Sequence, residues 1–249
     1  MSSNVHPTAI VHPESTLEDD VELGPYAIVG ARVHLGRGTR LSAHAMVEGP
    51  TRLGEGNVLF PFAVVGSVAQ DKRHAGAPGS LEVGDANVFR EHVTIHRGTS
   101  GRATRIGHHN LFMAGAHAAH DTVLGSHITL ANGVQLAGHS KVDDYATFGG
   151  LSGVAQFVHV GESSFVAAGA MCERNVPPFV VVQGDRARIR ALNKVGLQRR
   201  GLDESDIAAL SKAYALLFGT HRPRAQAIAE LPDELRSNPF VTRLLAALG

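Results

Sequence analysis

Aliphatic side chains recur every six residues along most of this chain, and a small or β-branched residue follows each of them after four positions. A first run extends from Val5 to Val65, and a second run extends from Ile106 to Val166. Between the two runs the pattern resumes only briefly, at Val83, Phe89 and Ile95.

This period predicts a short strand followed by a turn. It matches neither the α-helix, with 3.6 residues per turn, nor a strand in which side chains alternate with a period of two. Three such units make one triangular coil of 18 residues, and successive coils stack in parallel with each aliphatic side chain pointing inwards. A β-sandwich would instead need strands spaced about 8–12 residues apart, and the sequence lacks that spacing.

Two interruptions of the pattern predict loops on the surface of this prism. Residues 66–80 are polar and rich in Gly and Pro, and residues 100–105 form a shorter excursion. Insertions in a repeat protein often lie on its binding face, although a tolerated surface loop would give the same pattern. The charged run Asp71-Lys72-Arg73 favours a functional role for the first loop.

The repeats stop after Pro177-Pro178, because this dipeptide can continue neither a helix nor a central strand. We therefore predict a β-domain over residues 1–186 and a helical domain over residues 187–249. One predicted helix has Asp203 as its N-cap and ends at Gly219, and shorter helices are expected at 224–231 and 239–248. The apolar face of the first of these helices, between Asp203 and Gly219, consists of Ile207, Leu210, Tyr214, Leu217 and Phe218.

The helical domain is too small to bury much surface alone, so we expect it to pack on the prism or on a partner. A bare prism would also expose flat faces of parallel strands. We therefore expect a homotrimer, in which three prisms lie side by side and the sites occupy the clefts between subunits.

Composition narrows the class of protein further. The formal net charge is zero, so no basic excess points to nucleic acid. The one cysteine, Cys172, excludes an internal disulfide and fits a reducing compartment. The sequence contains no run of about 18 apolar residues that could span a membrane, and its first residues do not resemble a signal peptide. We therefore expect a cytoplasmic protein without a membrane segment.

The densest candidate chemistry lies at His117, His120 and Asp121. The acid next to His120 can orient one ring nitrogen and leave the other as a general base, and His139 follows one coil later. Such a base could deprotonate a hydroxyl or amine that attacks an acyl thioester. Alternatively, three histidines could bind zinc and activate water, as in the carbonic anhydrases built on a left-handed β-helix. Those enzymes usually space the first two ligands four residues apart, so the His-x-x-His spacing favours the base and no metal or other cofactor.

Several motifs together resemble one family. They are Val93-Thr-Ile-His-Arg-Gly-Thr99, Ala116-His-Ala-Ala-His-Asp121, Leu130-Ala-Asn132, Leu136-Ala-Gly-His139, Val176-Pro-Pro178, Gln183-Gly184 and Leu197-Gln-Arg-Arg-Gly201. The chain resembles the UDP-N-acetylglucosamine O-acyltransferases of lipid A biosynthesis. The resemblance implies a left-handed parallel β-helix followed by a small C-terminal α-helical domain. It also implies transfer of an (R)-3-hydroxyacyl group from acyl carrier protein to the 3-hydroxyl of UDP-N-acetylglucosamine, by a cytoplasmic homotrimer without metal.

The resemblance also assigns roles to individual residues. His120 corresponds to the catalytic base, Asp121 to the acid that orients it, and Ala168 to the residue that limits acyl-chain length. Arginines suit a diphosphate because their fork geometry matches its oxygens. The residues that the resemblance places against substrate are Asp71, Arg73, His117, His139, Gln156, Asn193, Arg199 and Arg200.

Two departures from the family bear on the acceptor. Ala155 stands where the family commonly has His or another polar residue, and Val195 stands where it commonly has Glu. An alternative function is therefore N-acylation of a 3-amino UDP-sugar. For chain length, Ala168 and His120 both lie two residues past an inward position, and their 48-residue separation predicts about 13 Å along the prism axis.

Overall fold

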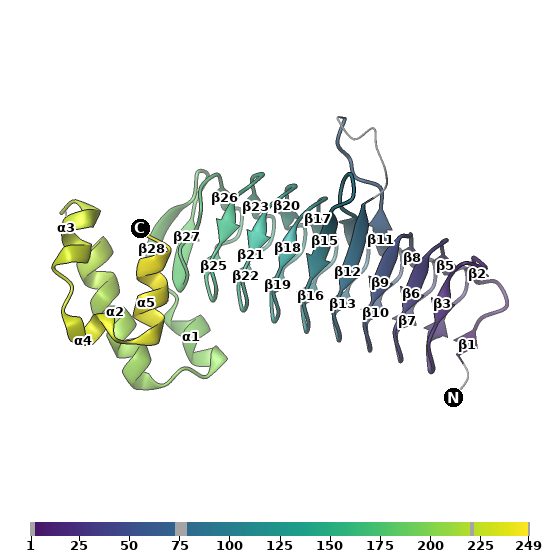
Figure 1. The fold of residues 1–249 in the computed structure, drawn as a ribbon, viewed down its shortest axis with the longest axis horizontal. Coiled ribbons are helices and arrows are strands. Elements are labelled where there is room, and N and C mark those ends of the chain that lie inside the picture. Colours follow the sequence, from purple (N-terminus) through teal and green to yellow (C-terminus); the bar gives the residue numbers. More distant parts are fainter. Residues whose placement is uncertain (1–2, 73–78, 220–221, 249) are drawn as a thin grey trace.

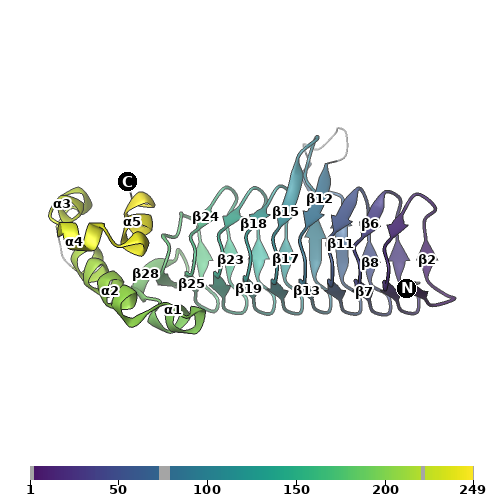
Figure 2. The ribbon, with the colours of Figure 1, turned by 60° about the horizontal axis from the view of Figure 1, so that its bottom comes forward.

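A computed structural model describes residues 3–72, 79–219 and 222–248 of the chain. The fold is a left-handed parallel β-helix, as the six-residue pattern and the family resemblance predicted, and a group of helices lies at its C-terminal end (Figure 1). Each complete coil contributes one short strand to each of three sheets, which form the three sides of a long prism (Figure 2).

We call the three sheets A, B and C in the order in which the chain visits them. Sheet A contains β1 (Asn4–Val5), β4 (Glu22–Leu23), β7 (Arg40–Leu41), β10 (Val58–Leu59), β13 (Val88–Phe89), β16 (Leu111–Phe112), β19 (Thr129–Leu130), β22 (Thr147–Phe148), β25 (Phe165–Val166), β27 (Val180–Gln183) and β28 (Arg188–Leu192). Sheet B contains β2 (Ile10–Val11), β5 (Ile28–Val29), β8 (Met46–Val47), β11 (Val64–Ser67), β14 (Thr94–His96), β17 (His117–Ala118), β20 (Gln135–Leu136), β23 (Gly153–Val154) and β26 (Met171–Cys172). Sheet C contains β3 (Thr16–Leu17), β6 (Val33–Leu35), β9 (Thr51–Leu53), β12 (Ser80–Val83), β15 (Ala103–Ile106), β18 (Val123–Leu124), β21 (Lys141–Val142) and β24 (His159–Val160).

The register of the strands explains the six-residue pattern. In the regular coils, residues 18 apart pair directly, as Leu130 pairs with Phe148 and Leu136 with Val154. The aliphatic or aromatic residue of each strand faces inwards, and Leu130 and Leu136 are fully buried. Because the same position repeats on all three sides, the core is one continuous column of apolar side chains.

The outer faces of the three sheets differ in polarity. The outward residues of sheet C are mostly polar or charged: Thr16, His34, Arg52, Glu82, Arg105, Val123, Lys141 and His159. Three successive strands of each of the other two sheets carry apolar residues at the same position: Val58, Val88 and Leu111 on sheet A, and Ile28, Met46 and Val64 on sheet B. Sheet C is therefore the face best suited to water, and sheets A and B are the faces suited to being covered.

The turns between sheets form three edges, which we name A–B, B–C and C–A. Both insertions leave the prism at the B–C edge, one between β11 and β12 and the other between β14 and β15 (Figure 1). They are shorter than predicted, because the residues at their bases extend the strands. Ser80 pairs with Ala103 and Glu82 pairs with Arg105, so the predicted ranges 66–80 and 100–105 both overlap sheet.

The C-terminal region also begins later than predicted. Beyond residue 186, β28 folds back antiparallel to β27, so the sheet continues to Leu192. The helices are α1 (Lys194–Arg200), α2 (Glu204–Phe218), α3 (Arg224–Ala229), α4 (Asp233–Arg236) and α5 (Pro239–Ala246). The predicted helix over 203–219 is confirmed as α2, although the Asp203 side chain makes no capping hydrogen bond.

The helices share a second apolar core, which packs on the end of the prism. Phe179, which follows the Pro-Pro pair, is fully buried in this core together with Leu197, Leu210 and Val241. No helix among the described residues is long and apolar enough to cross a membrane.

A buried ladder of asparagines supports the C–A edge. Asn57, Asn87 and Asn110 are almost completely buried, at successive coils. The Asn87 side chain donates to Asn57 Oδ1 and to the Gly107 carbonyl, both at 3.0 Å. Its own Oδ1 accepts hydrogen bonds from the Asn110 backbone N–H and side-chain amide, at 3.0 and 2.9 Å. Each Asn thus satisfies buried polar groups of the next coil.

Replacing Asn87 with Leu should lower the free energy of unfolding by at least about 2 kcal/mol, because the buried Asn110 N–H and Gly107 carbonyl lose their partners. Urea denaturation followed by circular dichroism measures this change. Arg52→Ala, on the exposed face of sheet C, should change it by no more than about 0.5 kcal/mol. Equal losses in the two variants would contradict this role for the ladder.

Candidate active site

Strand β17 and the turn after it place the predicted chemistry on sheet B and the B–C edge. His117 is the outward residue of β17, and His120 and Asp121 follow in the turn towards β18. Asp121 has a φ of 60°, the left-handed conformation that lets the chain turn the corner. The next coil adapts to the imidazole, because a Cβ on Gly138 would lie only 2.7 Å from His120 Cε1 and Nε2.

His120 and Asp121 form a buried pair. The Nδ1 of His120 lies 2.8 Å from Asp121 Oδ2, and both side chains are about 5 % exposed or less. The carboxylate is held from the other side by Thr99, whose backbone N–H donates to Oδ1 at 3.1 Å and whose hydroxyl donates to Oδ2 at 2.7 Å. The shorter insertion on the B–C edge, which begins near Thr99, therefore fixes the acid.

The electrostatics of the pair determine whether Asp121 is ionised and which nitrogen of His120 carries the proton. Burial raises the pKa of Asp121, but hydrogen bonds from His120 and Thr99 outweigh burial and hold this pKa below its usual value. An ionised carboxylate at Nδ1 selects the tautomer in which Nδ1 carries the proton. The described residues offer no hydrogen bond to Nε2 of His120, so this nitrogen can accept a proton from a bound molecule.

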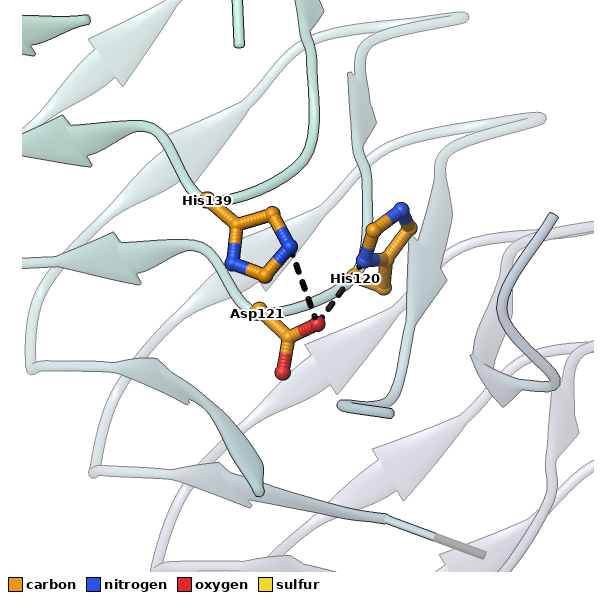
Figure 3. A group of neighbouring side chains, drawn as sticks. All are labelled: His120, Asp121 and His139. Atoms are coloured by element: carbon orange, nitrogen blue, oxygen red, sulfur yellow. Dashed lines mark hydrogen bonds and ion pairs between the residues drawn. The ribbon is translucent and has the colours of Figure 1, made fainter. Parts of the chain in front are cut away.

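His139 completes a cluster of three. It lies one coil beyond Asp121, as the 18-residue repeat predicts, and its Nε2 is 3.6 Å from the same Oδ2 (Figure 3). Its ring meets His120 edge-on at 5.2 Å and stacks on Phe157 at 4.8 Å, measured between centroids. The three side chains could each supply one metal ligand, since these atoms lie within 4.8 Å of one another.

A residue that sequence reasoning missed, His96, lies behind His117. The two rings meet edge-on at 4.9 Å, and His117 Nδ1 lies 2.8 Å from the Thr94 hydroxyl. Burial lowers the pKa of His117, and burial together with the neighbouring His117 and His120 lowers the pKa of His96 to about 4. His96 Nδ1 is buried without a hydrogen-bond partner among the described residues. Neither its burial nor its unpartnered Nδ1 could be read from the sequence.

An apolar groove of about 440 Å³ starts at His117 and follows the outer face of sheet B. Its lining comes from three rows of residues, one of which is the inward row of Leu136, Val154 and Cys172. The outer row is formed by the outward residues of successive sheet B strands: His117, Gln135, Gly153 and Met171. The edge row follows those strands: Ala137, Ala155 and Glu173. Gln156 is exposed on the B–C edge beside Ala155, so these two predicted positions lie next to the groove.

Other predicted residues line a second cavity, of about 600 Å³, between α1 and sheet A at the C–A edge. Asn193 donates to the Ser163 carbonyl at 2.8 Å and caps α1 by accepting from the Gly196 N–H. Arg200 pairs with Glu162 at 2.7 Å and lies over the Tyr145 ring. These two residues have structural partners already. Arg199 and Val195 are exposed in the wall of the same cavity.

The predicted site residues therefore do not form one cluster within a protomer. The His120 cluster lies on the B–C edge, and the cavity of Arg199 lies on the C–A edge, at the opposite side of sheet C. Asp71 lies in the first insertion, which leaves from the B–C edge, and Arg73 lies outside the described residues.

Ala168 lies on a different edge of the prism from His120, because 48 residues is not a whole number of 18-residue coils. It lies on the A–B edge, in the turn between β25 and β26, and does not line the groove of its own protomer. Its role in limiting acyl-chain length stays a prediction.

The buried histidines predict a dependence of stability on pH. His96 binds its proton less readily in the folded protein than in the unfolded chain, so protonation favours unfolding as the pH falls from about 6.5 towards 4. The loss from this group should be on the order of 3 kcal/mol. Urea denaturation across this pH range should show that the free energy of unfolding falls less in His96→Phe than in the wild type. Parallel curves for the two proteins would contradict the assignment.

The chain is similar to known proteins of one family. Residues 175–249 match a family model described as UDP N-acetylglucosamine O-acyltransferase, domain 2. The chain is 43% identical to the acyl-[acyl-carrier-protein]–UDP-N-acetylglucosamine O-acyltransferase of Synechocystis sp., over 97% of this chain and 87% of that protein. It is also 43% identical to the enzyme of the same name from Thiobacillus denitrificans, over 99% of this chain and 96% of that protein.

Solved structures show the same relationship. LpxA from Acinetobacter baumannii superimposes with a TM-score of 0.92 and 38% identity, over 98% of this chain and 96% of that one. The UDP-N-acetylglucosamine acyltransferase of Arabidopsis gives a TM-score of 0.86 and 34% identity, over 98% and 95% of the two chains. On this identity across nearly its whole length, the chain belongs to the family of acyl-[acyl-carrier-protein]–UDP-N-acetylglucosamine O-acyltransferases.

Proposed function

We propose that this protein transfers an (R)-3-hydroxyacyl group from acyl carrier protein to the 3-hydroxyl of UDP-N-acetylglucosamine, in the cytoplasm, as the first step of lipid A biosynthesis. The observation that carries the proposal is the buried His120–Asp121 pair, which follows His117 at the start of an apolar groove, in a chain that belongs to this family. Hydrogen bonds from Thr99 and His120 hold the pKa of Asp121 below its usual value and keep the carboxylate ionised. This carboxylate gives His120 the tautomer that a general base needs.

The chemistry follows from that tautomer. Nε2 of His120 removes the proton from the sugar 3-hydroxyl while the oxygen attacks the thioester carbonyl carbon. Asp121 stabilises the imidazolium that results, because its Oδ2 faces the protonated Nδ1. The tetrahedral intermediate then collapses, its carbon–sulfur bond breaks, and His120 returns the proton to the departing thiolate of the carrier protein. The ester forms, the free thiol leaves, and the base is regenerated.

The groove and the α1 cavity suit different parts of the two substrates. The groove on sheet B is apolar and starts at His117, three residues before His120, so it suits the acyl chain. His117, His139, Gln156 and Asp71 lie on sheet B or the B–C edge, where the sugar would meet the base. The cavity at α1 offers Arg199, whose guanidinium can bind a diphosphate through paired hydrogen bonds. Asn193 and Arg200 line the same cavity, and each spends part of its hydrogen-bonding capacity on Ser163 or Glu162.

A homotrimer would bring these two cavities together. If the A–B edges of three protomers meet at a threefold axis, sheet A of one protomer faces sheet B of the next. This packing covers the two apolar faces and leaves the polar sheet C exposed. It also places the C–A edge of one protomer against the B–C edge of its neighbour, so the Arg199 cavity meets the His120 cluster across one cleft.

Two alternatives each have one observation in their favour. N-acylation of a 3-amino UDP-sugar is favoured by Ala155 and Val195, because these two departures from the family line the groove and the α1 cavity. A zinc-dependent hydratase is favoured by the proximity of ligand atoms on His120, Asp121 and His139. For Asp121, however, both oxygens already accept hydrogen bonds from Thr99, and its Oδ2 also contacts His120.

Mass spectrometry of the reaction products separates these functions. The purified protein is incubated with UDP-N-acetylglucosamine, or its 3-amino analogue, and a panel of 3-hydroxyacyl carrier proteins, with and without EDTA. The proposal predicts an O-acylated product that forms equally well in EDTA. Faster acylation of the amine would select the N-acyltransferase, and one zinc per subunit lost together with activity would select the hydratase.

In the same assay, His120→Ala should lower kcat by at least about 10²-fold, because general-base catalysis contributes about 10²–10⁴ in rate. The matched control is His34→Ala, which removes another imidazole 2.8 Å from a carboxylate, that of Glu18, but on the outer face of sheet C. The control should keep wild-type turnover, and both variants should keep the wild-type circular dichroism spectrum. More than a tenth of wild-type kcat in His120→Ala would reject this base.

A further inference from the structure

One carboxylate on the C–A edge joins two helices of the C-terminal region, α1 and α5, to the prism (Figure 1). Glu162 lies in the turn between β24 and β25, and its side chain is only 14% exposed. Its Oε2 accepts a hydrogen bond from Nη1 of Arg200, the last residue of α1, at 2.7 Å. Its Oε1 lies 2.7 Å from Nη1 of Arg243, on α5. We call Arg200, Glu162 and Arg243 the Arg–Glu–Arg triad.

The triad leaves one side edge of the Arg200 guanidinium open. Arg200 uses Nη1 alone for two hydrogen bonds, to Glu162 Oε2 at 2.7 Å and to the Ser163 hydroxyl at 2.8 Å. Its Cζ also lies 4.2 Å from the centroid of the Tyr145 ring, which gives the group a third fixed contact. Nε and Nη2, which share the other side edge, donate no hydrogen bond to the described residues. A guanidinium binds a phosphate through two parallel hydrogen bonds, and these two nitrogens can make them.

Attachment of α1 to the prism does not require these ion pairs. The Ser163 carbonyl already accepts a hydrogen bond at 2.8 Å from Asn193, which caps the start of α1. Taking charges out of water also costs free energy that offsets much of their attraction, and Arg200 and Glu162 are only 18% and 14% exposed. The ion pairs therefore add more to the orientation of Arg200 than to the stability of the helix.

Arg243 makes a carboxylate acceptable beside a site for an anion. An isolated negative charge on Glu162 would repel a diphosphate in the α1 cavity. Arg243 balances that charge, so the three side chains together carry one net positive charge. Arg243 also occupies Oε1, and Glu162 therefore cannot use both oxygens on Arg200 and cover the edge that a phosphate needs. Arg243 is itself held, with its Cζ 4.5 Å from the centroid of the Phe240 ring.

We propose that Glu162 and Arg243 position Arg200 for a nucleoside diphosphate bound in the α1 cavity. This inference rests on the proposed function, because it assigns that cavity to the diphosphate of the acceptor. Arg200 lines the cavity, whereas Glu162 and Arg243 do not, so the two positioning residues act through Arg200. A guanidinium that is already fixed loses little freedom when the ligand binds, and this strengthens binding.

Isothermal calorimetry with UDP as the probe measures the effect directly. Glu162→Gln should weaken UDP binding at least about threefold, because Arg200 loses its charged partner and gains freedom that binding must remove. Removal of a negative charge alone would instead tighten the binding of an anion, so the sign of the change separates orientation from charge. Arg243→Met should also weaken binding at least about threefold, since the freed Oε1 then competes with the phosphate for Arg200.

A double-mutant cycle shows whether Glu162 acts through Arg200. Arg200→Met removes the guanidinium and should itself weaken UDP binding. In that background, Glu162→Gln should no longer weaken binding, because the side chain that it positions is absent. An equal loss from Glu162→Gln in both backgrounds would mean that Glu162 acts independently of Arg200 and would overturn the proposal.

Arg236→Met is the matched control within the helical domain. Arg236 donates hydrogen bonds to the Leu231 and Ile228 carbonyls, so it supports the helices without contacting the triad. This variant should lower the midpoint of thermal unfolding and leave UDP affinity unchanged. Affinities are compared at a temperature where circular dichroism shows every variant to be folded. A loss of UDP affinity in Arg236→Met equal to that in Glu162→Gln would assign the effect to the stability of the helices and overturn the positioning role.

Steady-state kinetics keeps this inference separate from the proposed reaction. With UDP-N-acetylglucosamine as the varied substrate, Glu162→Gln should raise KM at least about threefold while kcat changes less, because Glu162 contacts no group of the His120 cluster. Unchanged or tighter UDP binding in Glu162→Gln would overturn the proposal, as would a wild type that binds no UDP. An absence of O-acylated product, with the calorimetric pattern intact, would reject only the proposed function.

Discussion

The structure depends on one constraint, which is that residues 18 apart must stack in parallel register. Each inward position then repeats up the prism, so the core needs the same kind of side chain at every coil, and the column from Val21 to Val182 meets that need. Buried polar groups follow the same rule, as the asparagine ladder shows. The register also aligns the turn positions of successive coils. For this reason His139 lies beside the His120–Asp121 pair, although it comes from the next coil.

The same register divides the functional residues between two edges. His120 and Asp121, the proposed base and its acid, lie on the B–C edge, and Thr99 from the shorter insertion holds Asp121 in place. Arg199 lies on the C–A edge, because α1 packs against that side of the prism. A single protomer thus presents two partial sites that face away from each other. Their separation and the two apolar faces lead to the same proposal, an active site completed by a neighbouring subunit.

Much of this architecture was readable from the sequence, because a six-residue period has few structural solutions. The position of His139 beside Asp121 followed from their 18-residue separation alone. The position of Ala168 did not, because 48 residues carries the chain to another edge, and counting along the axis ignores which side a residue occupies. His96 was missed because residue spacing does not show that a side chain is buried, or that its Nδ1 has no hydrogen-bond partner among the described residues. Helix α1 was missed because seven residues carry little periodicity.

The most direct test of the shared site is subunit complementation. His120→Ala and Arg199→Ala are each purified, mixed in equal amounts, unfolded together and refolded, and the acyltransfer rate is compared with that of each variant refolded alone. If the site combines the B–C edge of one protomer with the C–A edge of the next, one cleft in four should contain both intact residues, and the mixture should recover about a quarter of wild-type activity. A mixture no more active than the mean of the two variants would contradict a site shared between subunits.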